Sequence, residues 1–177
     1  MEKCFLVLGL DNAGKTSVLQ AFSEVSLVWP MAGFEIESVK GTGTALERFR
    51  PPEKCHFKLV SWNMRRHETI RQHWKSYFDI ADGLLFVVDS AGRHRLAEAR
   101  QELHRLIEEL PNVPVSILAN KQDLIHSLPA EEIFEAMGFT GDRPWSCQAC
   151  SAREREGVQD GVDCLLDIIR SSSVSSL

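Results

Sequence analysis

Gly9-Leu10-Asp11-Asn12-Ala13-Gly14-Lys15-Thr16 is the stretch that decides the fold. It matches the pattern G-x-x-x-x-G-K-[ST], in which a glycine-rich loop joins a strand to a helix. The flanks agree, because Lys3–Leu8 has the apolar character of a buried strand and Ser17–Phe22 that of a helix start. Backbone N–H groups of such a loop point at an anion. Four fixed positions with matching flanks favour a phosphate-binding loop over a glycine turn that holds no ligand.

The loop chemistry predicts a nucleoside phosphate with a magnesium ion. The Lys15 ammonium would reach the β- and γ-phosphates, and the Thr16 hydroxyl would bind Mg²⁺. We therefore expect nucleotide contacts from Gly9, Leu10, Asp11, Asn12, Ala13, Gly14, Lys15, Thr16 and Ser17. The loop alone allows either ATP or GTP.

The segment Asn120-Lys121-Gln122-Asp123 favours guanine as the base. Guanine presents two adjacent donors, N1–H and the 2-amino group, and the Asp123 carboxylate can accept both. Adenine has an acceptor at that edge, so the carboxylate would lose its partners at a cost of a few kcal/mol. The Lys121 stem can lie over the base while its ammonium stays hydrated.

Two further positions complete the predicted base site. Asn120 can bridge the base and the phosphate loop, and a backbone N–H near Ser151-Ala152 could donate to guanine O6. The alternative for Asn120–Asp123 is a turn at a helix start, with the aspartate as its cap. The sequence favours the base-binding interpretation over that alternative, because the phosphate loop lies upstream and the Ser-Ala pair downstream. Each of the three segments follows a predicted strand.

Strand and helix patterns alternate along the chain and predict a single doubly wound α/β domain over residues 1–170. Apolar or alternating runs predict strands, and apolar residues at helical spacing predict helices. The expected strands after the first are Phe57–Trp62, Gly83–Asp89, Pro114–Ala119 and Trp145–Cys150, and the expected later helices are Leu96–Leu110, Glu131–Met137 and Val158–Arg170. Ligands of such sheets bind at the carboxyl ends of the strands, where these motifs fall.

Two segments do not fit this alternation of strands and helices. The stretch Lys40–Lys54 contains two glycines and two prolines, and it predicts a long surface loop between two strands. Residues 171–177 include five serines and predict a polar disordered tail.

The composition of the chain indicates its cellular location and limits its possible partners. The chain has 177 residues, 44% of them hydrophobic, and a net charge of −5, which argues against non-specific binding of nucleic acid. Five cysteines without a secretory signal predict reduced thiols and a cytoplasmic location. No apolar run reaches transmembrane length, and Glu2 in place of glycine predicts no N-myristoylation. We expect a monomer that reaches membranes only through partners.

Four segments carry a family resemblance. They are Gly9-Leu10-Asp11, Phe86-Val87-Val88-Asp89-Ser90, Arg100-Gln101-Glu102-Leu103 and Ala119-Asn120-Lys121-Gln122-Asp123-Leu124. With them the chain resembles the Ras superfamily, and within it the ADP-ribosylation-factor-like (Arf-like) GTPases, over nearly its whole length. The resemblance implies a P-loop G domain, a six-stranded mostly parallel sheet with about five helices, GTP or GDP with Mg²⁺, and protein effectors or regulators. It also implies an effector surface at Phe34, Trp62 and Tyr77, although ordinary packing remains the alternative for these aromatic residues.

The chain departs from this family where the family reads the γ-phosphate. Met31 replaces the threonine that binds Mg²⁺, and Asn63 replaces the aspartate that supports the ion through water. Arg66 replaces the glycine whose N–H meets the γ-phosphate, and His67 replaces the glutamine that orients the attacking water. His67 is thus the candidate catalytic residue, and the Mg²⁺ site is expected to be weakened.

Three functions remain possible from the sequence. The first is a switch enzyme that hydrolyses GTP weakly. The second is a nucleotide-bound scaffold or interaction module that does not hydrolyse it. The third is a P-loop kinase, against which the Asn120–Asp123 segment argues.

Overall fold

A computed structural model describes residues 2–28, 33–39, 44–50, 56–61, 77–140 and 142–174, with side chains for 3–21, 77–140 and 142–172. Met31, Trp62, Asn63, Arg66 and His67 lie outside the described residues, so the predictions for them stay predictions.

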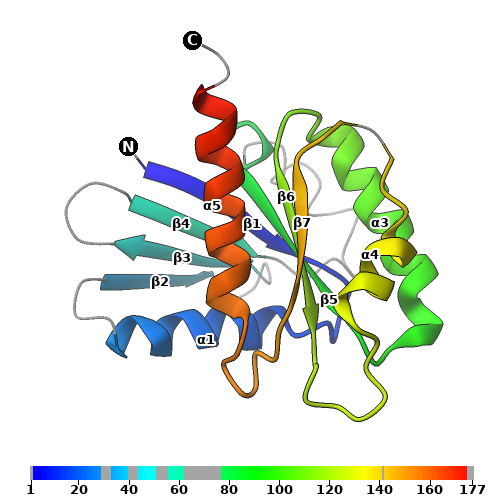
Figure 1. Ribbon diagram of the computed structural model, residues 1–177. Helices are drawn as coiled ribbons and strands as arrows, with labels where there is room; N and C mark the ends of the chain where they lie inside the picture. Colours follow the sequence, from blue (N-terminus) through cyan, green and yellow to red (C-terminus); the bar gives the residue numbers. More distant parts are fainter. Residues whose placement is uncertain are drawn as a thin grey trace.

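The described elements form one sheet flanked by helices (Figure 1). Seven strands pair in the order β2-β3-β4-β1-β5-β6-β7, and β4, β1, β5, β6 and β7 run parallel. The strands are β1 (Glu2–Leu8), β2 (Gly33–Val39), β3 (Thr44–Arg50), β4 (His56–Ser61), β5 (Gly83–Asp89), β6 (Val115–Asn120) and β7 (Trp145–Ala149). The helices are α1 (Lys15–Val28), the 3₁₀ turn η1 (Arg93–Arg95), α3 (Leu96–Glu109), α4 (Ala130–Met137) and α5 (Val158–Val174). The expected doubly wound α/β fold is confirmed.

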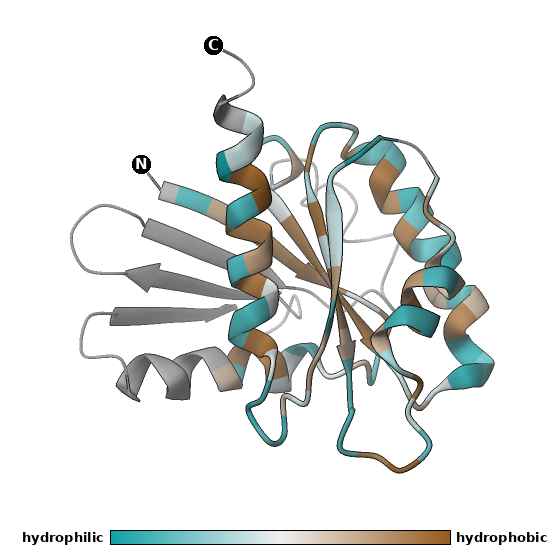
Figure 2. Ribbon diagram, in the orientation of Figure 1, coloured by the Kyte–Doolittle hydropathy of each residue, from teal (hydrophilic) through white to brown (hydrophobic). Residues whose placement is uncertain are grey.

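Helices cover both faces of the sheet, which explains why its central strands are apolar throughout. On one face Leu6, Leu84 and Phe86 pack against α3 and α4; on the other face Val7 and Leu85 pack against α1 and α5. Brown and teal residues alternate along the described parts of α3 and α5 in Figure 2, as expected of helices with one apolar face. Among the described residues no helix is long and apolar enough to cross a membrane.

The strand order reverses beside β1, and this places the predicted motifs together. The chain leaves β1 through α1 toward β2, β3 and β4, and then returns to the other side of β1 as β5, β6 and β7. Crevices at the carboxyl ends of strands next to such a reversal are where doubly wound folds bind ligands. The phosphate loop follows β1, Asn120 ends β6, and Ser151 lies two residues beyond β7.

The prediction of a loop over Lys40–Lys54 was wrong, because β3 occupies Thr44–Arg50 within it. With this strand the described residues form seven strands, where six were expected. It pairs antiparallel with β2 on one side and with β4 on the other, so its backbone groups have partners on both sides. The glycines and prolines that suggested a loop flank the strand instead.

The C-terminal helix also runs farther than expected. The predicted tail began at Ser171, but α5 continues to Val174. Ser171 and Ser172 donate their hydroxyl protons to the carbonyl oxygens of Asp167 and Ile168, at 2.8 and 2.9 Å, one helical turn earlier. Serine hydroxyls can bond back to a helix in this way, so both side chains have partners within α5.

Candidate functional site

Two glycines allow the phosphate loop to pass close to neighbouring strands. Gly9 and Gly14 have φ values of +152° and +103°. A Cβ at Gly9 would lie 2.3 Å from the Val87 carbonyl oxygen, and one at Gly14 would lie 2.3 Å from Asn120 Nδ2. Asn12, with φ of +61°, adds a third left-handed position that asparagine tolerates. The loop that the motif predicted is therefore formed, and its glycines are required by space as well as by conformation.

The Lys15 ammonium folds over this loop. Its Nζ donates to the carbonyl oxygens of Gly9 and Leu10, at 2.8 and 2.7 Å. Burial lowers the pKa of Lys15 from 10.5 to about 8, partly offset by the nearby Asp11 carboxylate and reinforced by the Arg95 charge. A cation held at a loop of N–H groups suits a phosphate, which would supply the anionic partner that burial makes favourable.

Asn120 ties the base-binding segment to the phosphate loop, as predicted. Its Nδ2 donates to the Ala13 carbonyl oxygen at 3.0 Å, and its Oδ1 accepts the Ala152 backbone N–H at 2.9 Å. The residue is only 2% exposed. A single buried side chain thus fixes three loops, because each of its bonds would cost about 1–3 kcal/mol to leave unmade.

Asp123 and Ser151 meet at the edge of the base site. The Ser151 hydroxyl donates to Asp123 Oδ1 at 2.7 Å and accepts the Glu154 N–H at 3.1 Å. The two residues line a cavity of about 380 Å³, together with Gln122, Ala149, Cys150, Glu154, Glu156 and Gly157. The serine orients the carboxylate, which can then accept paired donors from a planar base.

Lys121 follows Asn120 and is held by a residue for which the sequence predicted no role of its own. Its Nζ lies 2.8 Å from Asp89 Oδ2, and its backbone φ is +67°. Asp89 ends β5, next to β6 in the sheet, and its register partner is Asn120. The pairing of β5 with β6 brings the carboxylate and the ammonium together, which no local pattern reveals.

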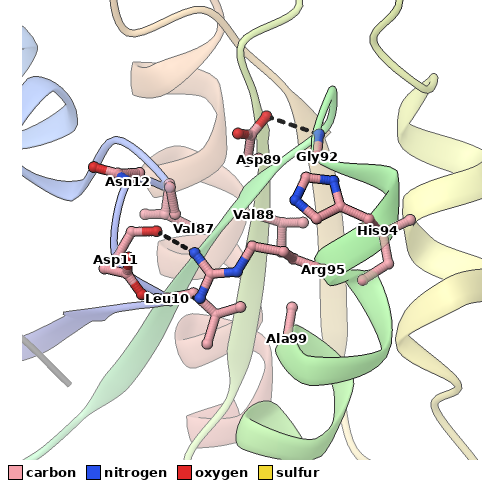
Figure 3. Close-up of a pocket in the computed structure, with 12 residues that line it drawn as sticks. Leu10, Asp11, Asn12, Val87, Val88, Asp89, Gly92, His94, Arg95 and Ala99 are labelled. Atoms are coloured by element: carbon pink, nitrogen blue, oxygen red, sulfur yellow. Dashed lines mark hydrogen bonds and ion pairs between the residues drawn. The ribbon is translucent and has the colours of Figure 1, made fainter. Parts of the chain in front are cut away.

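A second such residue, Arg95, bridges η1 to the phosphate loop (Figure 3). Its guanidinium donates to the Asp11 carboxylate at 2.9 Å and to the Asp11 carbonyl oxygen at 3.0 Å. The same group contacts Glu98 at 3.0 Å, and these hydrogen bonds raise the pKa of Arg95. The bridge borders a cavity of about 190 Å³ between the loop, the end of β5 and α3.

The described residues fit a guanine nucleotide. The loop from Gly9 to Ser17 would hold its phosphates, and Asn120, Lys121, Asp123, Ser151 and Ala152 would hold its base. Thr16 lies exposed in the first turn of α1, where a hydroxyl oxygen can serve Mg²⁺. Within the part of the chain that is described, no group of three His, Cys, Asp or Glu side chains could hold a metal without a phosphate.

The predicted effector surface is only partly described. Tyr77 packs against the core cluster that includes Leu84 and Phe86, which agrees with the packing alternative. Phe34 lies in β2 opposite Phe49 of β3. Trp62 lies outside the described residues, so the surface itself stays a prediction.

Comparison with known proteins shows similarity over nearly the whole chain. Residues 1–169 match the model of the ADP-ribosylation factor family. The chain is 39% identical over 175 residues to "ADP-ribosylation factor-like protein 3" of Chlamydomonas reinhardtii, covering 96% of this chain and 92% of that protein. It is 37% identical over 174 residues to the protein of the same name from Caenorhabditis elegans, covering 95% and 88%. The chain therefore belongs to the ADP-ribosylation factor family of small GTPases, whose members bind GTP and GDP with Mg²⁺.

Proposed function

We propose that this protein binds GDP or GTP as an Arf-like regulator of trafficking or signalling and hydrolyses GTP slowly or not at all. The observation that carries the proposal is the Asn120 side chain, which joins the phosphate loop at Ala13 to the base site at Ala152. Binding of phosphate alone would not require the phosphate loop to be joined to the segment after β7. With Asp123 beside it, the link supports guanine recognition.

The choice of base can be tested by exchanging one atom type. An Asp123→Asn variant presents an amide N–H₂ where guanine needs an acceptor, and xanthine carries a carbonyl oxygen in place of the 2-amino group. We expect the variant to lose affinity for GDP by more than tenfold and to gain affinity for XDP. Asp142→Asn, at an exposed position, is the matched control. Equal affinity of Asp123→Asn and the unaltered protein for GDP would contradict guanine recognition at this site.

Slow or absent hydrolysis is proposed from Met31, Asn63, Arg66 and His67. These residues replace groups that in the family hold Mg²⁺, contact the γ-phosphate or orient water, whereas the guanine site has no such replacement. Single-turnover GTP hydrolysis should therefore run at a rate close to that of Lys15→Ala, in which phosphate binding is impaired. A rate far above this variant favours the switch enzyme over the non-hydrolysing interaction module.

The nucleotide that the purified protein carries helps to distinguish a protein that holds one nucleotide from one that switches between two. The purified protein should release a guanine nucleotide when it is denatured, and the base and phosphate number can be read by chromatography. Release of ATP or ADP in its place would support the kinase alternative and contradict the proposed binding of a guanine nucleotide.

Protein effectors or regulators are proposed as partners at Phe34, Trp62 and Tyr77, with the protein acting as a cytoplasmic monomer. Partner binding that is unchanged by exchange of GDP for GTP would favour the interaction module.

A further inference from the structure

We propose that Asp89 is a positioning residue that holds Lys121 ready for the nucleoside and thereby slows nucleotide release. The inference rests on the proposed guanine-nucleotide function and deepens it. Asp89 belongs to no predicted binding motif, and it would act through Lys121 rather than on the nucleotide.

Both oxygens of the Asp89 carboxylate are engaged. Oδ2 lies 2.8 Å from Lys121 Nζ, while Oδ1 accepts the backbone N–H groups of Ala91 at 2.9 Å and Gly92 at 3.1 Å. Figure 3 shows the carboxylate beside the Gly92 N–H at the start of the turn. A carboxylate fixed by two backbone donors cannot rotate freely, so its second oxygen stays directed at the lysine.

The surrounding backbone supports the same arrangement. The Ser90 N–H donates to the Asn120 carbonyl oxygen at 3.0 Å, which joins the ends of β5 and β6 one residue before Lys121. A Cβ at Gly92 would lie 3.3 Å from Asp89 Cγ, so a larger residue there would press on the carboxylate. The position of Asp89 is therefore set by elements that exist without the lysine.

Lys121 needs such a partner because its conformation is otherwise unfavourable. Its backbone φ of +67° is a left-handed conformation, which costs a residue with a Cβ about 1–2 kcal/mol. Its long side chain also has much rotamer freedom to lose when the stem packs on a base. A bond to Asp89 restricts that freedom before the nucleotide binds, and pre-organisation of this kind strengthens binding.

A purely structural role of Asp89 is the alternative, since an aspartate that accepts two N–H groups of a turn stabilises the turn by itself. The two roles differ in their dependence on Lys121. A positioning role disappears when the Lys121 ammonium is removed, whereas a turn-stabilising role does not.

The test is a double-mutant cycle on the rate at which mant-GDP leaves the full-length protein in Mg²⁺ buffer, chased by excess GDP. Asp89→Asn keeps the shape and one acceptor oxygen but removes the charge, and Lys121→Met keeps the stem but removes the ammonium. We expect Asp89→Asn to release mant-GDP about tenfold faster, equivalent to about 1.4 kcal/mol, and to add almost nothing in the Lys121→Met background. Asp79→Asn, an exposed charge-matched control, should release at the unaltered rate.

Two outcomes would overturn the inference alone: a release rate for Asp89→Asn equal to that of the unaltered protein, or the same acceleration with and without Lys121→Met. If Asp89→Asn does not fold, Asp89→Ser keeps an oxygen for the turn without the charge, and the same cycle applies to it. If the unaltered protein retains no mant-GDP and releases no guanine nucleotide on denaturation, the proposed function fails as well. Retention of mant-GDP by the unaltered protein therefore separates the two failures.

Discussion

Single residues of the phosphate loop have requirements that their immediate neighbours in the sequence do not explain. Gly14 must be glycine because the loop turns through a φ of +103° directly beneath the Asn120 amide. Lys15 is half-buried and donates to two carbonyl oxygens, and desolvation makes its charge costly until a phosphate arrives. Both constraints come from β6 and from the loop curling over itself.

Gly14→Ala should destabilise the protein by about 2 kcal/mol or more. The added Cβ would overlap Asn120 Nδ2, displacing the amide from Ala13, and alanine also disfavours positive φ. Urea unfolding gives the free energy of unfolding directly. Asn12→Gly, at a neighbouring left-handed position that glycine adopts readily, should change it by about 0.5 kcal/mol or less. A Gly14→Ala protein as stable as the unaltered one would contradict the close approach of the loop to Asn120.

The lowered pKa of Lys15 predicts a pH dependence in the nucleotide-free protein. The folded pKa of about 8 lies below the value of 10.5 expected for the unfolded chain, so between these two pH values the unfolded chain binds more protons. The free energy of unfolding should therefore gain from this residue as pH rises from about 8 to 10.5, and this contribution should be absent below pH 8. The measurement is urea unfolding across that range, with Lys15→Met as the control. Identical slopes for the two proteins would refute the shifted pKa.

At the level of elements, the turn between β5 and α3 contacts both the phosphate loop and the base-binding segment. Asp89 at its start contacts Lys121 beside the base site, and Arg95 at its end contacts Asp11 in the phosphate loop. The turn thus connects the two nucleotide-binding segments from outside them. Neither contact could be expected from helix or strand patterns, because each joins residues that are far apart in the chain.

Arg95→Ala should loosen the phosphate loop. It removes the bonds to the Asp11 carboxylate and carbonyl oxygen, and because Arg95 is about a third exposed we expect a loss of only about 1 kcal/mol in the free energy of unfolding. Release of mant-GDP should accelerate several-fold, as followed by fluorescence during a GDP chase. Arg93→Ala changes the charge equally at an exposed position of the same turn and should have little effect on either quantity. Equal effects of both variants would point to net charge rather than to the bridge.

For the whole molecule, the sheet order brings the ends of β1, β5, β6 and β7 to the same edge of the sheet. A ligand that contacts β1, β6 and the segment after β7 at once should stabilise all of them together, because a ligand that binds only the folded state raises its stability by mass action.

GDP should therefore raise the melting temperature of the protein, and ADP at the same concentration should not. Replacing Mg²⁺ with EDTA should reduce the GDP effect only slightly, because Met31 and Asn63 lack the oxygen and the charge that support the ion in the family. The Asp123→Asn variant serves as the control, since it should lose the GDP effect while keeping the fold. Complete loss of the GDP effect in EDTA would show that Mg²⁺ is held strongly despite these substitutions.

Much of the fold could be predicted because its elements have local patterns. The apolar runs of β5 and β6 and the helical spacing of α3 give nearly the observed bounds, since buried parallel strands and amphipathic helices leave such patterns. The strand β3 was missed because its backbone partners come from β2 and β4, while its own glycine and proline flanks suggested a loop. The extension of α5 was missed because serine has low helix propensity, although both hydroxyls find carbonyl partners in the helix here.

The sequence by itself determined the phosphate loop, the guanine-recognition segment and the doubly wound class, because each depends on residue types at short spacings. The link from Asn120 to that loop was also predicted from the sequence. Only the tertiary structure decided that Asp89 holds Lys121 and that Arg95 holds Asp11. The physical reason is the same in both cases. Each contact depends on which strands lie side by side in the sheet, and strand order is fixed by long-range packing rather than by any local run of residues.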